Sequence, residues 1–248
     1  MPAPQALLAA LLGHRTRGAA PNIADASSVQ SSQIAAALLD DLGLLGNIVP
    51  HVGQTLGREF ESEVANDLRV RLVEANQDRM WDVQHPGRPL AEFEQYQHLG
   101  VLDQIIDDDD TGVLALAIGR DYEVAPDVTI GETVPQHIFP LLHATVSCKA
   151  TIRSDRAQNV RLEAFMLNRH RNGRLPHIVV VTAEPLPSRL ASLCRGTGDI
   201  DAVYHLALPQ LQAAVAAVGA PNQQSVLNEL VAQRRLLDYS ELIATLAR

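Results

Sequence analysis

The chain has 248 residues, a formal net charge of −9, 46% hydrophobic residues and a mean hydropathy near zero, which fit a folded globular protein and exclude a disordered or integral-membrane one. No apolar run approaches the length of a membrane span, and residues 7–12 follow no basic residue, so they predict an amphipathic helix rather than a signal peptide. Cys148 and Cys194 provide neither a disulfide framework nor CxxC metal spacing, so we expect a protein of a reducing cytoplasm.

The first half of the chain is predicted to be mostly helical. Apolar periodicity predicts helices over residues 5–12, 32–45, 55–75 and 90–106. A run of four aspartates at residues 107–110 comes next and is expected to form a solvated loop. We therefore expect residues 1–106 to form a mostly helical N-terminal part.

Alternating and β-branched residues become frequent after residue 111. They predict strands over residues 112–119 and 122–130, joined by a turn at Arg120-Asp121, and over 143–152, 177–182 and 200–205. Helices are predicted over residues 155–170, 187–195, 208–218 and 224–236. This order predicts one α/β domain over residues 1–248, with a mixed central sheet in a core at 112–205 and C-terminal helices at 206–248.

The basic residues are unevenly distributed in type and in position. Of the 20 Lys and Arg residues, 19 are Arg and the remaining one is Lys149. A position that retains lysine under such a skew can be one that needs a compact, rotatable charge, although drift explains a single lysine equally well. Residues 153–195 carry eight Arg against three acidic residues, a local charge of +5 that is compatible with DNA binding.

Three groups of polar residues coincide with the predicted central strands. Asp127 lies near the end of the second strand, and Ser147 and Lys149 share a face of the third, because residues two apart in a strand point the same way. Glu163 flanks the apolar stripe of the following helix and is expected to face partly toward the sheet. Two carboxylates and a lysine beside a sheet suit phosphodiester hydrolysis, since carboxylates hold Mg²⁺ and lysine steers the attacking water and balances charge on the phosphate.

Each of these residues alone has a plainer interpretation. An aspartate after proline is typical of a turn, and a lone glutamate is typical of an exposed helix face. Lys149 has no comfortable structural explanation, because an ammonium buried in an apolar strand without partners costs free energy. The combination therefore favours an active site.

Pro126-Asp127, Ser147-Cys148-Lys149 and Glu163 resemble the motif of the PD-(D/E)xK nucleases, and more narrowly that of the CCGG group of type II restriction endonucleases, the NgoMIV type. In that group serine replaces the acidic residue two positions before the lysine, and a glutamate on the next helix takes its place. The 13 residues between Lys149 and Glu163 match the family spacing, whereas the 19 between Asp127 and Ser147 are fewer than in the type member. The resemblance implies a restriction-endonuclease-like α/β fold, with a central mixed β-sheet flanked by helices.

The resemblance also implies roles at the active site. Asp127 and the carbonyl of Cys148 would ligate Mg²⁺, with two ions per site. Lys149 would position the nucleophile, Glu163 would complete the acidic shell, and Ser147 would assist through its hydroxyl or a bound water.

Residues 153–156, Arg-Ser-Asp-Arg, resemble the R-x-D-R element with which the family reads bases from a helix N-terminus in the major groove. Arginine can bond to O6 and N7 of guanine, and aspartate can accept from N4 of cytosine, so these residues suit a CCGG half-site. The alternative is that Ser154 or Asp155 caps the helix while Arg153 and Arg156 are solvated.

Weaker matches to the family lie outside the central strands. They are Arg189 for the outer G·C pair, Asp25 and Ser27 for outer base pairs, Gln54 for the minor groove, and Glu61 for an accessory acidic residue of an N-terminal helix. Glu59 and Glu63 are alternatives to Glu61.

The resemblance thus implies a Mg²⁺-dependent type II site-specific deoxyribonuclease that cuts double-stranded DNA at GCCGGC after the first G and leaves 5′-phosphate ends. It also implies a homo-oligomer, either a dimer or a tetramer of back-to-back dimers acting best on two sites. A cognate DNA methyltransferase is expected in the same restriction-modification system but not as a physical partner, and no membrane association is expected.

Three other functions remain open. His170, Asn172 and His177 loosely resemble an HNH cluster, although Asn172-Gly173 is typical of a turn. A PD-(D/E)xK repair nuclease or junction resolvase would share the metal site without the R-x-D-R reader. A DNA-binding regulator would use residues 153–156 but would leave Lys149 and its neighbours unexplained.

Overall fold

The computed structural model describes residues 7–13, 21–25, 27–44, 54–120, 122–196 and 198–247. Within those residues one sheet contains six strands, whose order in space follows their order in the chain. The strands are β1 (Met80–Gln84), β2 (Val128–Thr133), β3 (Leu141–Lys149), β4 (His177–Thr182), β5 (Ala202–His205) and β6 (Leu236–Asp238). The pairs β1–β2 and β2–β3 are antiparallel and the pairs from β3 to β6 are parallel, so the sheet is mixed, as predicted.

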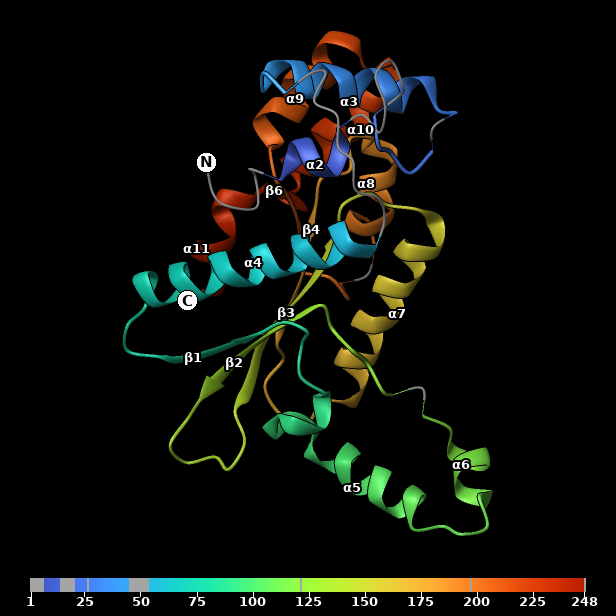
Figure 1. Ribbon diagram of the computed structural model, residues 1–248, viewed down its shortest axis with the longest axis vertical. Helices are drawn as coiled ribbons and strands as arrows, with labels where there is room; N and C mark the ends of the chain where they lie inside the picture. The colour runs from blue at the N-terminus through green and yellow to red at the C-terminus, as the bar shows by residue number, and fades with distance from the viewer. Residues whose placement is uncertain are drawn as a thin grey trace.

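Helices flank this sheet on both faces (Figure 1). They are α2 (Leu8–Leu12), α3 (Val29–Asp41), α4 (Gln54–Ala75), α5 (Gln97–Asp107), α6 (Val113–Ile118), α7 (Ser154–His170), α8 (Pro187–Cys194), α9 (Leu208–Val218), α10 (Pro221–Ala232) and α11 (Leu242–Leu246), with the 3-10 helices η1 (Leu90–Glu92), η2 (Glu94–Tyr96) and η3 (Tyr239–Glu241). In the part of the chain that the structure describes, none of these helices is long and apolar enough to span a bilayer.

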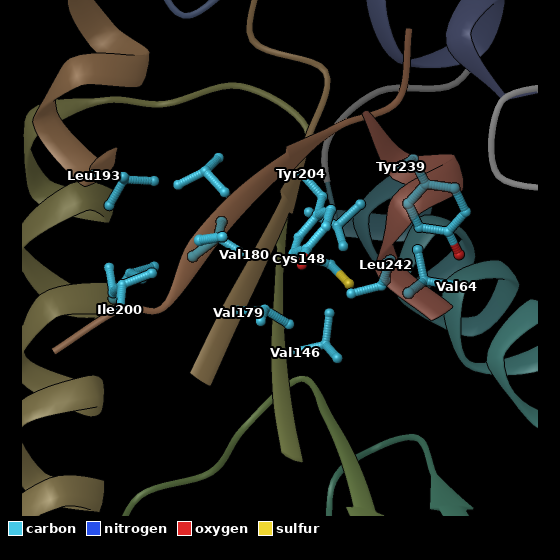
Figure 2. Packing of buried hydrophobic residues seen from close by; sticks show 14 of the residues in the cluster. Val64, Val146, Cys148, Val179, Val180, Leu193, Ile200, Tyr204, Tyr239 and Leu242 are labelled. Atoms are coloured by element: carbon cyan, nitrogen blue, oxygen red, sulfur yellow. The ribbon is translucent and has the colours of Figure 1, made fainter. Parts of the chain in front are cut away.

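The central strands are buried on both faces, which explains their nearly continuous apolar sequence. Figure 2 shows Val180 and Leu193 on the side of α7 and α8, and Cys148 and Val64 on the side of α4 and α11. Because side chains alternate along a strand, the two neighbours of Cys148 in β3 point to the opposite face, toward α7.

The C-terminal segment closes the face of the sheet that α4 covers. The hydroxyl of Tyr239 donates a hydrogen bond of 2.8 Å to Oδ2 of Asp67 on α4. Nε2 of the buried His143 on β3 lies 2.7 Å from the carbonyl oxygen of Leu246 on α11. Both contacts tie the C-terminal segment to elements that come much earlier in the chain.

The strand predicted over residues 112–119 is wrong, because this segment forms the helix α6. Asp109 accepts the N–H of Leu114 at 2.7 Å, and Thr111 accepts that of Val113 at 3.3 Å, so polar side chains satisfy the first N–H groups of the helix. None of the six residues of α6 is buried, and a strand here would have no neighbour in the sheet. Asp121, in the predicted turn, lies outside the described residues.

Other elements have bounds that differ from the predicted ones, or were not predicted, where the sequence pattern covers few residues. The strand predicted over 122–130 begins only at Val128, and the helix predicted over 90–106 is divided into η1, η2 and α5. The strands β1 and β6 were not predicted and lie outside residues 112–205. They have five and three residues, too few for a clear alternation. Arg234, with a left-handed φ of 53°, lies between the end of α10 and β6, where a helix was predicted to continue.

Candidate active site and DNA-reading surface

The paired ends of β2 and β3 bring Asp127 to the predicted catalytic strand. Val128 opens β2 and lies opposite Val146 in antiparallel register, so the residue before β2 lies beside the end of β3. The N–H of Cys148 donates a hydrogen bond of 2.7 Å to Oδ2 of Asp127. The sheet register and this bond together fix the carboxylate at the C-terminal end of β3.

Lys149 lies against the same carboxylate oxygen. Its Nζ donates to Oδ2 of Asp127 at 2.5 Å, and both side chains are about one-fifth exposed. Burial alone would lower the pKa of the ammonium, but the charge of Asp127 and the hydrogen bond to it outweigh burial and raise the pKa above its ordinary value. The partner that a buried lysine requires is therefore present.

Glu163 faces the sheet from α7, as predicted. Its Oε1 accepts a hydrogen bond of 3.3 Å from the hydroxyl of Ser147, which is buried on β3. Burial raises the pKa of Glu163 to about 7, with a further contribution from the negative charge of Asp127, while Lys149 and the bond from Ser147 oppose the rise. Ser147, Lys149 and Glu163 thus share one side of β3.

Glu61 approaches this group from α4. Burial raises the pKa of its carboxyl, and the nearby charge of Asp127 raises it further. Its Oε2 lies 3.9 Å from Nδ1 of His85, and that same nitrogen is 3.1 Å from the main-chain oxygen of Asp127. The structure therefore brings Glu61 to the predicted site.

Glu61, Lys149 and Glu163 border a cleft of about 610 Å³ between the start of α4 and the first turns of α7. The first turns of α4 lie beside α7 in Figure 1. The cleft is lined by residues of both helices and by the segment that follows β3, among them Arg58, Glu61, Lys149, Asn159 and Glu163. Its walls carry both acidic and basic groups, as a site for a phosphodiester and a cation requires.

The oxygen donors of this site fit a hard divalent cation. Asp127, Glu163, Glu61 and the carbonyl of Cys148 are oxygen ligands. Burial, with a smaller contribution from the charge of Asp127, raises the pKa values of Glu163 and Glu61, and a bound cation would offset both effects. Within the described ranges, no three His, Cys, Asp or Glu side chains already converge as a metal-binding group. The donor set therefore suits an ion that keeps water or phosphate among its ligands rather than an all-protein cage.

Residues 153–156 form the exposed beginning of α7. The N-cap residue of α7 is Arg153, and no side chain caps the helix, so the alternative in which Ser154 or Asp155 serves as the cap is wrong. Nη1 of Arg156 donates to the carbonyl of Thr151 at 3.3 Å. Arg153 and Arg156 both line the cleft that contains Lys149.

The residues matched to outer base pairs form a second group. Nη2 of Arg189, on α8, lies 3.5 Å from Oδ2 of Asp25. The N–H and hydroxyl of Ser27 donate to Oδ1 of Asp25 at 3.0 and 2.6 Å. Arg189 and Arg153 also line a shared cavity of about 350 Å³. Gln54 is the first residue of α4, at the end of that helix nearest the cleft.

Four residues near these groups were missed in the sequence. Arg58 and Asn159 line the cleft, His85 contacts Asp127 and Glu61, and Glu184 lies beneath Arg189. Nothing local marks the first three. Glu184 follows a buried parallel strand at its C-terminal end, where functional residues of α/β proteins gather, and that position is a signal.

The HNH-like residues do not form a catalytic cluster. Asn172 contacts His98, His177 lies beside Asp201, and the ring of His170 packs against Tyr122. These contacts lie around the N-terminal end of β4, away from Lys149.

Comparisons with known proteins identify the family of this chain. The family model for the NgoMIV restriction enzyme matches residues 5–137 and 134–247. The type II restriction enzyme NgoMIV of Neisseria gonorrhoeae is 36% identical over 270 aligned residues, which cover 96% of this chain and 93% of that relative. The chain therefore belongs to the NgoMIV restriction enzyme family and is a type II restriction endonuclease.

Proposed function

We propose that this endonuclease requires Mg²⁺ and cuts double-stranded DNA at the palindrome GCCGGC after the first G, leaving 5′-phosphate and 3′-hydroxyl ends. The observation that carries the proposal is the placement of Asp127, Lys149 and Glu163 at one end of β3, beside the exposed residues 153–156. A hydrolytic centre and a set of base-reading side chains then share one cleft.

Lys149 positions the attacking water in this mechanism. Its pKa is raised, so the ammonium stays charged at neutral pH and donates hydrogen bonds rather than accepting a proton. The same charge offsets the negative charge that develops on the phosphate during in-line attack. Ser147 donates to Glu163 and so holds this carboxyl of the acidic shell toward the strand.

Mg²⁺, when bound, polarises the phosphate and lowers the pKa of a bound water. We assign its ligands as Asp127 and the carbonyl of Cys148, with Glu163 and Glu61 completing the acidic surroundings and two ions per site. The N–H of Cys148 holds Asp127 at the strand end, which pre-orients this carboxylate before DNA arrives.

The exposed start of α7 reads the central CCGG. Arg153 and Arg156 donate to guanine and Asp155 accepts from cytosine, which suits the hydrogen-bonding edges of the two bases. Arg189, with Asp25 and Ser27, reads the outer G·C pair, and Gln54 contacts the minor groove. Arg58, exposed on the opposite wall of the cleft, suits a backbone phosphate.

The whole chain acts as one endonuclease domain in a homo-oligomer of two or four copies. Each subunit cuts one strand of the palindrome, because each carries one set of catalytic residues. A cognate methyltransferase protects the same sequence in the bacterial cytoplasm without binding the nuclease.

Mapping the cut ends tests this proposal. The purified chain is incubated with a plasmid of known sequence and Mg²⁺, and both fragment ends are sequenced. Discrete fragments that begin with 5′-phosphate-CCGGC are expected, EDTA is expected to abolish them and added Mg²⁺ to restore them. Fragments with other ends contradict the recognition sequence, and cutting that survives EDTA contradicts the metal.

A further inference from the structure

Glu184 is a fully buried carboxylate between β4 and α8, with 0% of its surface exposed. Burial raises its pKa to about 7, although two backbone hydrogen bonds and Arg189 oppose the rise. Burying such a group costs free energy unless its oxygens accept hydrogen bonds or face a positive charge.

Each oxygen of Glu184 accepts a main-chain N–H from a different DNA-reading segment. Oε2 accepts the N–H of Ile152 at 2.7 Å, in the loop that leads into α7. Oε1 accepts the N–H of Leu186 at 3.1 Å, the N-cap residue of α8. Ile152 immediately precedes Arg153, and Leu186 accepts the N–H of Arg189 at 2.9 Å.

The same carboxylate lies close to the side chain of Arg189, the proposed reader of the outer base pair (the outer reader). Oε1 is 3.9 Å from Nη1 of Arg189, a nitrogen that is buried without a hydrogen-bond partner among the described residues. The other side of this guanidinium faces Asp25. The buried imidazole of His205 contacts the main chain of Glu184 from β5. Glu184 therefore supports both the backbone and the guanidinium of the outer reader.

We propose that Glu184 is a positioning residue that fixes Arg153 and Arg189 relative to each other, and thereby sets sequence discrimination at the inner and outer base pairs without touching DNA. The inference rests on the proposed function, because it takes residues 153–156 and Arg189 as base readers. One carboxylate holds the two segments through a pair of charge-assisted hydrogen bonds, so a change in this one side chain affects both readers together.

The test compares Glu184→Gln with the unchanged chain. Glutamine has nearly the same shape, but only one of its terminal atoms accepts a hydrogen bond. One of the two segments then loses its anchor, so Arg153 and Arg189 are no longer held relative to each other. The kcat/KM for cleavage is measured on the preferred duplex, on a duplex with one changed inner pair and on a duplex with one changed outer pair. We expect the preference for the unchanged site to fall about tenfold or more against both altered duplexes, which lies within the usual discrimination per base pair.

Asp201→Asn is the matched control. Asp201 accepts the N–H of Ile178 at 3.1 Å at the opposite end of β4, far from the readers, and its change is expected to leave both preferences as they were. The Mg²⁺ concentration that gives half-maximal cleavage is also expected to stay the same in Glu184→Gln, because the catalytic carboxylates are untouched.

A merely structural role gives a different result. In that case thermal stability falls and all three duplexes are cut more slowly by the same factor, so both preferences stay constant and the proposal is overturned. If Glu184→Gln does not fold, Glu184→Asp, which keeps the charge on a shorter side chain, carries the same comparison. An unchanged chain that cuts DNA without sequence preference overturns the proposed function as well, and this is seen before any variant is compared.

Discussion

Lys149 illustrates how one charged side chain is kept inside an apolar strand. The carboxylate of Asp127 compensates the ammonium at 2.5 Å, and the same oxygen accepts the N–H of the residue before Lys149. Removing either charge leaves the other half-buried and uncompensated, which is destabilising as well as catalytically damaging. The two effects need separate measurements.

Replacing Lys149 by Ala is expected to lower the cleavage rate by about a hundredfold or more, because the group that orients water and balances phosphate charge is lost. Binding of a labelled GCCGGC duplex is expected to persist. Lys149→Arg keeps the charge but not the compact donor geometry, and we expect it to be nearly as inactive. Full cleavage by either variant contradicts the assigned role, and circular dichroism checks that both are folded.

Asp155→Ala and Arg189→Ala are expected to relax different positions of the recognition site. The first removes the acceptor for cytosine at the inner pairs, and the second removes the donor for the outer guanine, so each loses roughly 1–3 kcal/mol of discrimination at its own position. Cleavage of a library randomised at each base pair measures both. Each variant is the control for the other. An equal loss of sequence preference at all positions in both variants contradicts the assignment of separate readers.

The bounds of some elements were predicted from the sequence almost residue by residue, whereas β2 and β3, which position Asp127, Ser147 and Lys149, were displaced by two or more residues at each end. The strand β4 and the helix α9 have the predicted bounds, and α7 differs by one residue, because β4 is a continuous apolar run and the two helices are long and periodic. The helix α6 and the strands β1 and β6 were missed because their state depends on whether the fold provides a neighbouring strand. Glu184 was missed because its contact with the N–H of Ile152 joins segments 32 residues apart in the chain.

At the C-terminal helix α11, the structure predicts acid sensitivity through His143. Its Nε2 faces the carbonyl of Leu246 and so carries the proton, while Nδ1 faces Nη2 of Arg174 at 3.1 Å and accepts. Burial lowers the pKa of His143 to about 4, below the ordinary 6.5. The neutral His143 therefore contributes its full share to the free energy of unfolding above pH 6.5, and this contribution is lost as the pH falls toward 4.

Urea unfolding between pH 7 and pH 4 measures this loss, which linkage puts on the order of 3 kcal/mol at most. His143→Gln reproduces one donor and one acceptor without titrating, so its free energy of unfolding should fall less steeply over the same interval. His137→Gln, on the exposed turn after β2, is the control and should follow the unchanged chain. If His143→Gln keeps the full slope, other groups cause the acid sensitivity.

Across the whole molecule, a net charge of −9 repels DNA at a distance, while the arginines of the cleft attract it locally. The described part of one chain contains one set of proposed catalytic residues, whereas a palindromic site has two phosphodiester bonds to cut, one in each strand. The proposed oligomer resolves this mismatch by presenting two copies of the same cleft to the two strands.

Mixed oligomers test that arrangement. When the unchanged chain is refolded together with an excess of Lys149→Ala, most active oligomers contain one working subunit, and we expect them to nick a supercoiled plasmid rather than linearise it. Gel electrophoresis separates the nicked circle from the linear product. Linear product in constant proportion to nicked circle at every mixing ratio contradicts cutting of one strand per subunit.

The C-terminal closure of the sheet also bears on the timing of toxicity in the cell. A ribosome delivers Asp127, Lys149 and Glu163 well before β6 and before the carbonyl that His143 binds. A nascent chain at that stage holds all the proposed catalytic groups but lacks the edge strand β6 and the helix α11 that contacts β3, and domains generally fold as units. We expect these incomplete chains not to cleave chromosomal DNA. Cleavage in the cell then begins only after β6 and α11 have been translated.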